Sequence, residues 1–299
     1  LYHQIGYLIA IGKSIKELLD LAMSRENPLK KSEFRNKILE MIRDSVIFEK
    51  NNNGQIEELD YADLNYEDHK EYIHILLLLF NVETIRQKGD EDNRFPFERY
   101  KNEGTWSLEH IHAQNSESLK TNQDWKMWLE LHKRSLNSLL KNCDEHSKLA
   151  ISISEVIEKM DRVLTHIVEH RGSIRDEFND VAPAVVNILS DGDEKSQMHS
   201  ISNMALLTVG ENAALNNSTF DVKRVKILDM DRDGDYIPTC TKNVFMKYYS
   251  SSDTKLHFWA DEDRRCYIEA MNNVLYHYEY LKGEKIRLIK TEIHYGNKQ

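Results

Sequence analysis

The 299-residue chain contains little cysteine, proline or glycine: three cysteines, four prolines and eleven glycines. Cys143, Cys240 and Cys266 lie far apart, and no CxxC pair occurs. This argues against a zinc knuckle or a disulfide framework and favours a reducing cytoplasm. The scarcity of the two residue types that interrupt helices, together with abundant Leu, Ile, Lys and Glu, predicts a mostly helical protein.

Long apolar runs are also missing. The longest, at residues 73–80, includes His74 and is far shorter than the roughly 20 residues of a membrane-spanning helix. No basic-then-apolar signal peptide opens the chain. We therefore expect a cytoplasmic protein with no membrane partner. Because the chain begins at Leu1, within what reads as the middle of a helix, we expect it to be the C-terminal part of a longer protein.

An excess of positive charge is absent as well. Forty Lys and Arg stand against fifty Asp and Glu, which gives a formal charge of −10. Proteins that coat nucleic acids concentrate positive charge in order to displace counterions from phosphate, so a generic coat is excluded. A nucleic-acid enzyme is still compatible with this charge, since a bound metal ion supplies positive charge locally. One short stretch, residues 220–227, is net positive, with a single Asp against two Lys and one Arg.

The spacing of apolar residues predicts helices over most of the chain. The expected helices cover residues 5–23, 34–48, 66–87, 125–140, 154–169, 173–189, 220–228 and 261–281, and the expected strands cover 106–112 and 201–209. The predicted fold class is α+β, mostly α. A helical domain or connector is expected at residues 1–104 and a second domain at 105–299, interrupted by a helical insertion at about 120–200.

Two separated motifs carry the candidate chemistry. The first is Glu109-His110-Ile111, with Gln114 shortly after it. The second begins at Asn203, passes through an apolar segment and ends at Asn212. A carboxylate suits a hard cation such as Mg²⁺, and an imidazole can remove a proton from water near pH 7. Phosphodiester hydrolysis needs both an activated nucleophile and a cation close to the developing negative charge.

The order and spacing of these motifs resemble the HNH (ββα-metal) nuclease motif, and in particular the nuclease domain of GmrSD-like, modification-dependent restriction proteins. The similarity extends to the segment Asn217-Ser218-Thr219-Phe220-Asp221-Val222-Lys223-Arg224 and covers the chain from about residue 70 onwards. It implies an HNH ββα-metal core with a helical insertion, Mg²⁺ or Mn²⁺ as cofactor, and DNA as substrate. The implied activity is that of an endonuclease that restricts phage or other foreign DNA. The implied partner is an N-terminal nucleotide-dependent domain or subunit outside this chain.

The resemblance also implies roles for the residues closest to the chemistry. His110 would be the general base that activates water. Glu109 and Asn212 would hold the divalent cation, with Glu109 standing where many HNH enzymes have Asp. Asn212 takes the place of the last His of the motif, and its amide oxygen is an acceptable hard ligand.

Four further residues receive supporting roles from the same resemblance. Asn203 would tie the two strands together through backbone hydrogen bonds and so fix the histidine. Lys223 would contact a phosphate or the leaving group, with Arg224 as a weaker candidate. His112 is either a second active-site imidazole or a strand residue.

Other interpretations stay open. Asn203 and Asn212 are also typical turn residues at the ends of a strand, and Lys223 and Arg224 are compatible with a solvated helix face. The motif would then belong to a non-catalytic helical module that binds DNA or protein. A nuclease that cleaves RNA, as a toxin or abortive-infection effector, is the other alternative.

Two more patterns are expected to be structural. The acidic run at residues 229–235 resembles a calcium loop, but Cys240 stands where a bidentate Glu is required, so we expect an acidic surface turn. Trp125 and Trp128 are spaced three residues apart on an expected helix, which favours packing within the protein over base stacking.

Overall fold

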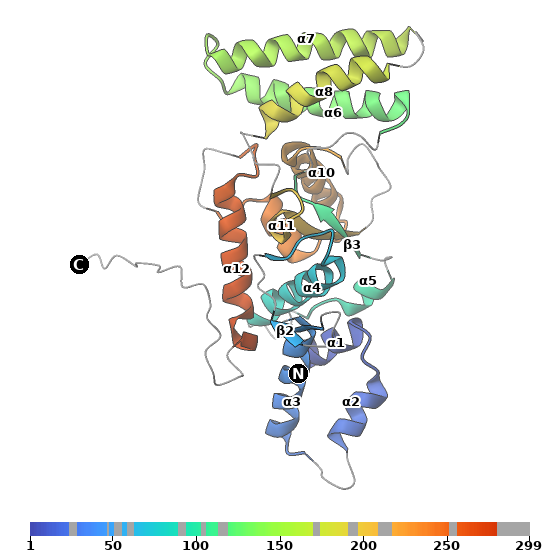
Figure 1. Cartoon of the computed structure of the whole chain (residues 1–299), viewed down its shortest axis with the longest axis vertical. Helices are drawn as coiled ribbons and strands as arrows, with labels where there is room; N and C mark the ends of the chain where they lie inside the picture. Colours follow the sequence, from blue (N-terminus) through green and yellow to red (C-terminus); the bar gives the residue numbers. More distant parts are fainter. Residues whose placement is uncertain are drawn as a thin grey trace, which may run out of the picture.

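The computed structural model describes residues 1–23, 29–46, 48–50, 56–58, 63–88, 94–102, 106–112, 119–169, 174–190, 197–208, 217–250 and 256–279. These residues form a mostly helical α+β protein with two small antiparallel sheets (Figure 1). The first elements are α1 (Tyr2–Ala10), α2 (Ile15–Ala22), α3 (Lys31–Val46), β1 (Phe48–Lys50), β2 (Ile56–Glu58), α4 (Lys70–Gln87) and α5 (Phe97–Asn102). The later elements are β3 (Trp106–His110), α6 (Asn122–Lys141), α7 (Lys148–Val168), α8 (Arg175–Leu189), η3 (Ile201–Asn203), β4 (Met204–Thr208), α10 (Phe220–Asp233), α11 (Thr239–Phe245) and α12 (Asp261–Glu279).

The expected helix over residues 5–23 is two helices. Gly12 has a φ of 99°, a left-handed conformation that glycine adopts at little cost. The N–H groups of Gly12 and Lys13 donate to the carbonyls of Ile9 and Leu8, so α1 ends in a Schellman motif. Ser14 then begins α2 by accepting a hydrogen bond from the N–H of Glu17 at 3.0 Å.

Two other expected elements differ at their ends. The helix expected to reach residue 48 stops at Val46, and Phe48 already pairs with Glu58 in the β1–β2 hairpin, which the sequence did not predict. The acidic run expected as a surface turn is helical up to Asp233, and Gly234 ends α10 with a φ of 88°. Asp229, Asp231 and Asp233 therefore belong to the last part of a helix rather than to a loop, and Asp235 follows it.

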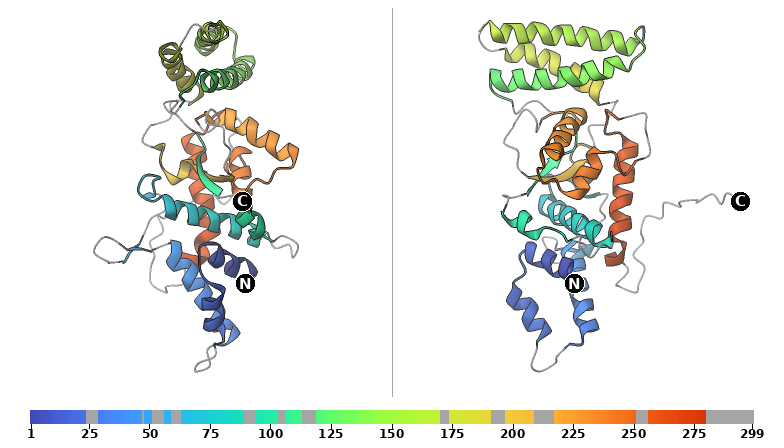
Figure 2. Two further views of the ribbon diagram at one scale, coloured as in Figure 1. Left: turned by 90° about the vertical axis from the view of Figure 1, so that its right-hand side faces the viewer. Right: turned by 180° about the vertical axis from the view of Figure 1, so that it is seen from behind.

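Helices α6, α7 and α8 form a three-helix bundle at one end of the molecule (Figures 1 and 2). The bundle has its own apolar core, in which Trp125, Trp128 and Phe178 are buried. The predicted packing role of the two tryptophans is therefore confirmed. The bundle falls between β3 and β4 in the sequence, within the stretch where an insertion was expected.

A second and larger core surrounds α4. This helix contacts α1, α3, α11 and α12 as well as both strands of the β3–β4 sheet. Helix α12 runs along one side of the molecule and reaches α3, α4 and η3 (Figure 1). One apolar core therefore continues across the expected boundary near residue 104. None of the described helices combines the length and apolar character that a membrane span requires.

The bundle is attached to the start of α10 by hydrogen bonds from α6. The indole N–H of Trp128 donates to the carbonyl of Asn217 at 3.1 Å. The N–H of Thr219, which precedes the first residue of α10, donates to Nε2 of His132 at 3.2 Å. The other ring nitrogen of His132 must then carry its proton, which it donates to the carbonyl of Trp128 at 2.8 Å. These bonds fix where α10 begins, and hence where Lys223 lies.

Candidate active site

The β3–β4 sheet brings the two sequence motifs together. The strands are antiparallel, with Trp106 opposite Thr208 and His110 opposite Met204. Asn203 is the residue just before β4, so it lies beside the end of β3 that carries His110. Helix α10 follows β4 in the chain and places Lys223 against the same end of the sheet.

Asn203 joins the two chain segments with its side chain. Its amide nitrogen donates to the carbonyls of His112 and Met198 at 2.8 and 2.9 Å, and its amide oxygen accepts from the N–H of His112 at 3.0 Å. The main chain continues the contact, because the N–H of Ile111 donates to the carbonyl of Asn203 at 2.8 Å. The side chain is 1% exposed, so these bonds are sheltered from water. Asn203 therefore holds the chain immediately after His110 in a fixed path.

Lys223 contacts the first motif through its ammonium group. Its ammonium donates to the backbone carbonyl of His110 at 2.5 Å, and only 6% of the residue is exposed. Burial lowers the pKa of Lys223 to about 8, and the Glu109 carboxylate partly opposes that shift. Burial raises the pKa of Glu109, with Lys223 opposing. The site thus contains a desolvated carboxylate and a desolvated ammonium within each other's electrostatic reach.

The imidazole of His110 is half-buried. Burial lowers its pKa to about 4, and the electrostatic effects of Lys223 and of the neighbouring His199 act in the same direction. At neutral pH the ring is therefore uncharged and keeps one nitrogen lone pair. Its Nε2 lies 3.4 Å from Nδ1 of His199, and the ring of Tyr66 lies 5.3 Å away between centroids.

His112 uses both of its ring nitrogens within the protein. Nδ1 accepts from the N–H of Phe220 at 3.1 Å, so Nε2 carries the proton and donates it to the hydroxyl of Ser190 at 3.0 Å. That hydroxyl donates in turn to the carbonyl of Val186 in α8. Burial lowers the pKa of His112 to about 3. Of the two roles left open by the sequence, this geometry favours the structural one, linking the bundle, the β3 end and α10.

The remaining predicted residues lie outside this cluster or outside the described residues. Arg224 donates from Nε to the carbonyl of Phe245 at 3.0 Å and so connects α10 with α11. Asn212, the second expected metal ligand, is not among the described residues, and neither is Gln114. Within the described ranges, no group of three or more His, Cys, Asp or Glu residues is arranged to hold a metal ion.

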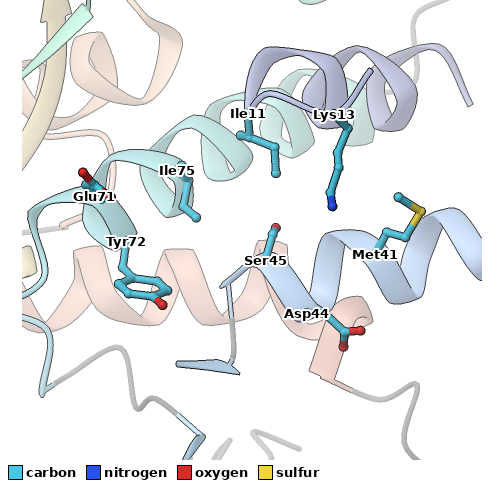
Figure 3. Close-up of a pocket in the computed structure, with 8 residues that line it drawn as sticks. All are labelled: Ile11, Lys13, Met41, Asp44, Ser45, Glu71, Tyr72 and Ile75. Carbon is cyan, nitrogen blue, oxygen red and sulfur yellow. The ribbon is translucent and has the colours of Figure 1, made fainter. Parts of the chain in front are cut away.

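A cavity of about 560 Å³ lies elsewhere, beside α1, α3 and α4 (Figure 3). Lys13, Asp44 and Glu71 are the charged residues on its wall, and none of the predicted site residues lines it. Ser45 also lines it, and its hydroxyl donates to the carbonyl of Ile42 rather than to a basic side chain.

Comparisons of the chain with protein-family models, with curated proteins and with solved structures found no match. The site must therefore be interpreted from its own chemistry. The structure brings together Glu109, His110, Asn203 and Lys223, three of them from one end of the β3–β4 sheet and one from α10.

The sequence did not single out two residues that adjoin His110. His199 stands in the turn before η3, and Tyr66 lies in the segment before α4. The N–H of Tyr66 donates to the carbonyl of His199 at 2.7 Å, which brings these segments to the same place. His199 belongs to no motif, and Tyr66 was expected only as the first residue of the helix over 66–87, so only the long-range contacts identify their place at the site.

Proposed function

We propose that this protein is a metal-dependent endonuclease with an HNH-type core, and that it hydrolyses DNA phosphodiester bonds. The observation that carries the proposal is the clamp by which Asn203 holds the chain beside His110 at the end of a two-stranded sheet. An uncharged imidazole, a carboxylate and a buried lysine meet there, and phosphodiester hydrolysis needs these types of group.

In this proposal His110 removes a proton from the attacking water. Its low pKa keeps the lone pair available at neutral pH. A pKa of about 4 is below the value that best suits a base at pH 7. A phosphodiester anion beside the ring would favour the protonated form and raise that pKa towards the working range. Substrate binding would therefore strengthen the base at the point where it is needed.

Glu109 is proposed to hold a divalent cation together with Asn212. The donor set, one carboxylate and one amide oxygen, fits a hard ion such as Mg²⁺ or Mn²⁺. Burial raises the pKa of Glu109, and no described residue donates a hydrogen bond to its carboxylate, so a cation would find it only partly satisfied. The bound ion would act as a Lewis acid on the phosphate.

Lys223 is proposed to contribute positive charge close to the scissile phosphate. Its ammonium already donates a hydrogen bond to the backbone carbonyl of His110. The chain as a whole carries a formal charge of −10, so attraction of DNA by net charge is unfavourable. This balance favours strict dependence on the metal and help from a partner in reaching foreign DNA. The resemblance implies that this partner is an N-terminal nucleotide-dependent domain or subunit.

A cleavage assay tests the proposal. Purified protein is incubated with plasmid DNA, and separately with RNA, in Mg²⁺, Mn²⁺ or a chelator. The unaltered protein should cleave DNA only with metal, and His110→Ala should abolish cleavage. His146→Ala is the matched control, because His146 is an exposed histidine far along the chain in the bundle. Equal cleavage by all three proteins would remove His110 from the reaction, and cleavage of RNA alone would replace DNA as the substrate.

A further inference from the structure

The imidazole of His199 faces the proposed base. The turn that carries His199 is fixed by main-chain contacts, since the carbonyl of His199 accepts from Tyr66 and the adjacent Ser200 forms a β-bridge with Asn65. The Tyr66 ring stacks on His199 at 6.3 Å with an interplanar angle of 24°. The His199 ring is therefore held in place on one side while its Nδ1 points to His110 at 3.4 Å.

The second nitrogen of His199 indicates how the protons are arranged. Its Nε2 lies 3.7 Å from a carboxylate oxygen of Glu67. A carboxylate accepts only, so it favours the tautomer of His199 that carries its proton on Nε2. Nδ1 of His199 is then the acceptor, and the partner nitrogen, Nε2 of His110, must be the donor. With its proton on Nε2, His110 has its lone pair on Nδ1.

We propose that His199 is a positioning residue that selects this tautomer of His110. The inference rests on the proposed function, because it assigns the nitrogen from which His110 would act. A neutral imidazole exchanges its proton between two nitrogens, and only one tautomer presents a lone pair in a given direction. A neighbouring acceptor that engages Nε2–H fixes both the tautomer and the plane of the ring, as the orienting partners of catalytic and metal-bound histidines do. Glu67 is exposed and 3.7 Å from the ring, so it favours one tautomer of His199 but adds little to the stability of the protein.

Two substitutions of His199 distinguish the effect of its hydrogen-bond acceptor from the effect of its ring. His199→Phe keeps an aromatic ring to stack on Tyr66 but has no acceptor. His199→Asn loses the ring but retains an amide oxygen close to the place of Nδ1. His199 is half-exposed, so both variants should fold. Full-length protein labelled with nitrogen-15 histidine is then studied at pH 7 by long-range proton–nitrogen correlation, and the His110 signals are assigned from their absence in His110→Ala.

The unaltered protein and His199→Asn should show His110 protonated on Nε2 alone, and His199→Phe should show a mixture of tautomers. In the plasmid assay, kcat of His199→Phe should fall roughly 10–100-fold with KM unchanged, and His199→Asn should restore most of it. The same His110 tautomer in all three proteins would overturn the proposal, as would an unchanged kcat in His199→Phe. The spectra need no substrate, so inactivity of every protein would refute the endonuclease proposal and leave the tautomer assignment to be judged separately.

Discussion

Replacing Asn203 by alanine removes three hydrogen bonds that the rest of the protein cannot replace. The N–H and carbonyl of His112 and the carbonyl of Met198 lose their partner. A hydrogen bond of this kind contributes about 1 kcal/mol net, and a buried peptide group left without a partner costs about 1–3 kcal/mol. Because Met198 is only half-buried and can regain water, we expect Asn203→Ala to lower the free energy of unfolding by about 3 kcal/mol.

The measurement is urea unfolding at pH 7, followed by tryptophan fluorescence. Trp259 is a suitable reporter, because its indole N–H donates to the carbonyl of Ser202 at 3.1 Å, next to the substituted position. Asn142→Ala is the matched control. Its side-chain amide also donates to a backbone carbonyl, that of Ser138, but it is exposed at the end of α6, so its loss should cost about 0.5 kcal/mol or less.

A loss of about 3 kcal/mol leaves a domain of ordinary stability folded at 25 °C. Cleavage by Asn203→Ala can therefore be measured on folded protein, and it should fall at least about 100-fold if the clamp orients the base. If Asn203→Ala and Asn142→Ala had the same unfolding free energy within about 0.5 kcal/mol, the three bonds would have no energetic importance and the clamp argument would fail.

Three further predictions concern the surroundings of the site. Lys223→Met should change the free energy of unfolding by no more than about 1 kcal/mol, because the removal of a buried charge offsets the lost hydrogen bond. The same substitution should abolish cleavage. Lys226→Met, at an exposed position on the same helix, is the control and should retain activity. The free energy of unfolding should decrease as the pH falls from about 6.5 to about 3. Histidine in the unfolded chain gains a proton near pH 6.5, whereas buried His112 and His132 gain theirs only near pH 3. Between pH 7 and pH 5, each of the two should lower the free energy of unfolding, measured in urea, by about 2 kcal/mol. A double variant, His112→Gln with His132→Gln, should flatten this pH dependence, and an unchanged slope would contradict the burial argument. Gly234→Ala should lower stability by about 1 kcal/mol in thermal unfolding, since the new Cβ meets open space and only the left-handed φ is strained. No change would show that this φ imposes no strain on alanine.

The sequence predicted the long elements well because their signal is periodic. The two strands of the site were expected at 106–112 and 201–209, and both are shorter. At one end, the side chain of Asn203 replaces the next strand pairing, so the chain leaves β3 after His110. Before β4, at the same end of the sheet, the hydroxyl of Ser200 accepts from the N–H of Ser202, and residues 201–203 form a 3₁₀ helix. Such side-chain-to-backbone competition carries no periodic signal.

The candidate site was predictable only where a motif marks it. Glu109, His110, Asn203 and Lys223 could be expected to meet because the motif resemblance gives their order. The placement of His199 could not, because it depends on a pairing between residues more than 130 positions apart, at Tyr66 and His199. The roles of Asn212 and of the metal remain predictions.

The position of the three-helix bundle has a consequence for how the protein folds. About ninety residues separate the end of β3 from the start of β4, whereas an ordinary hairpin closes over about four, and a flexible loop of the longer length would cost about 3 kcal/mol more in closure entropy. A bundle with its own core can form from local contacts first, and its hydrogen bonds to Asn217 and His112 then restrict the two segments that lead to the sheet. Helix formation in the insertion would then precede strand pairing, and the proposed base would acquire its neighbours among the last contacts to form.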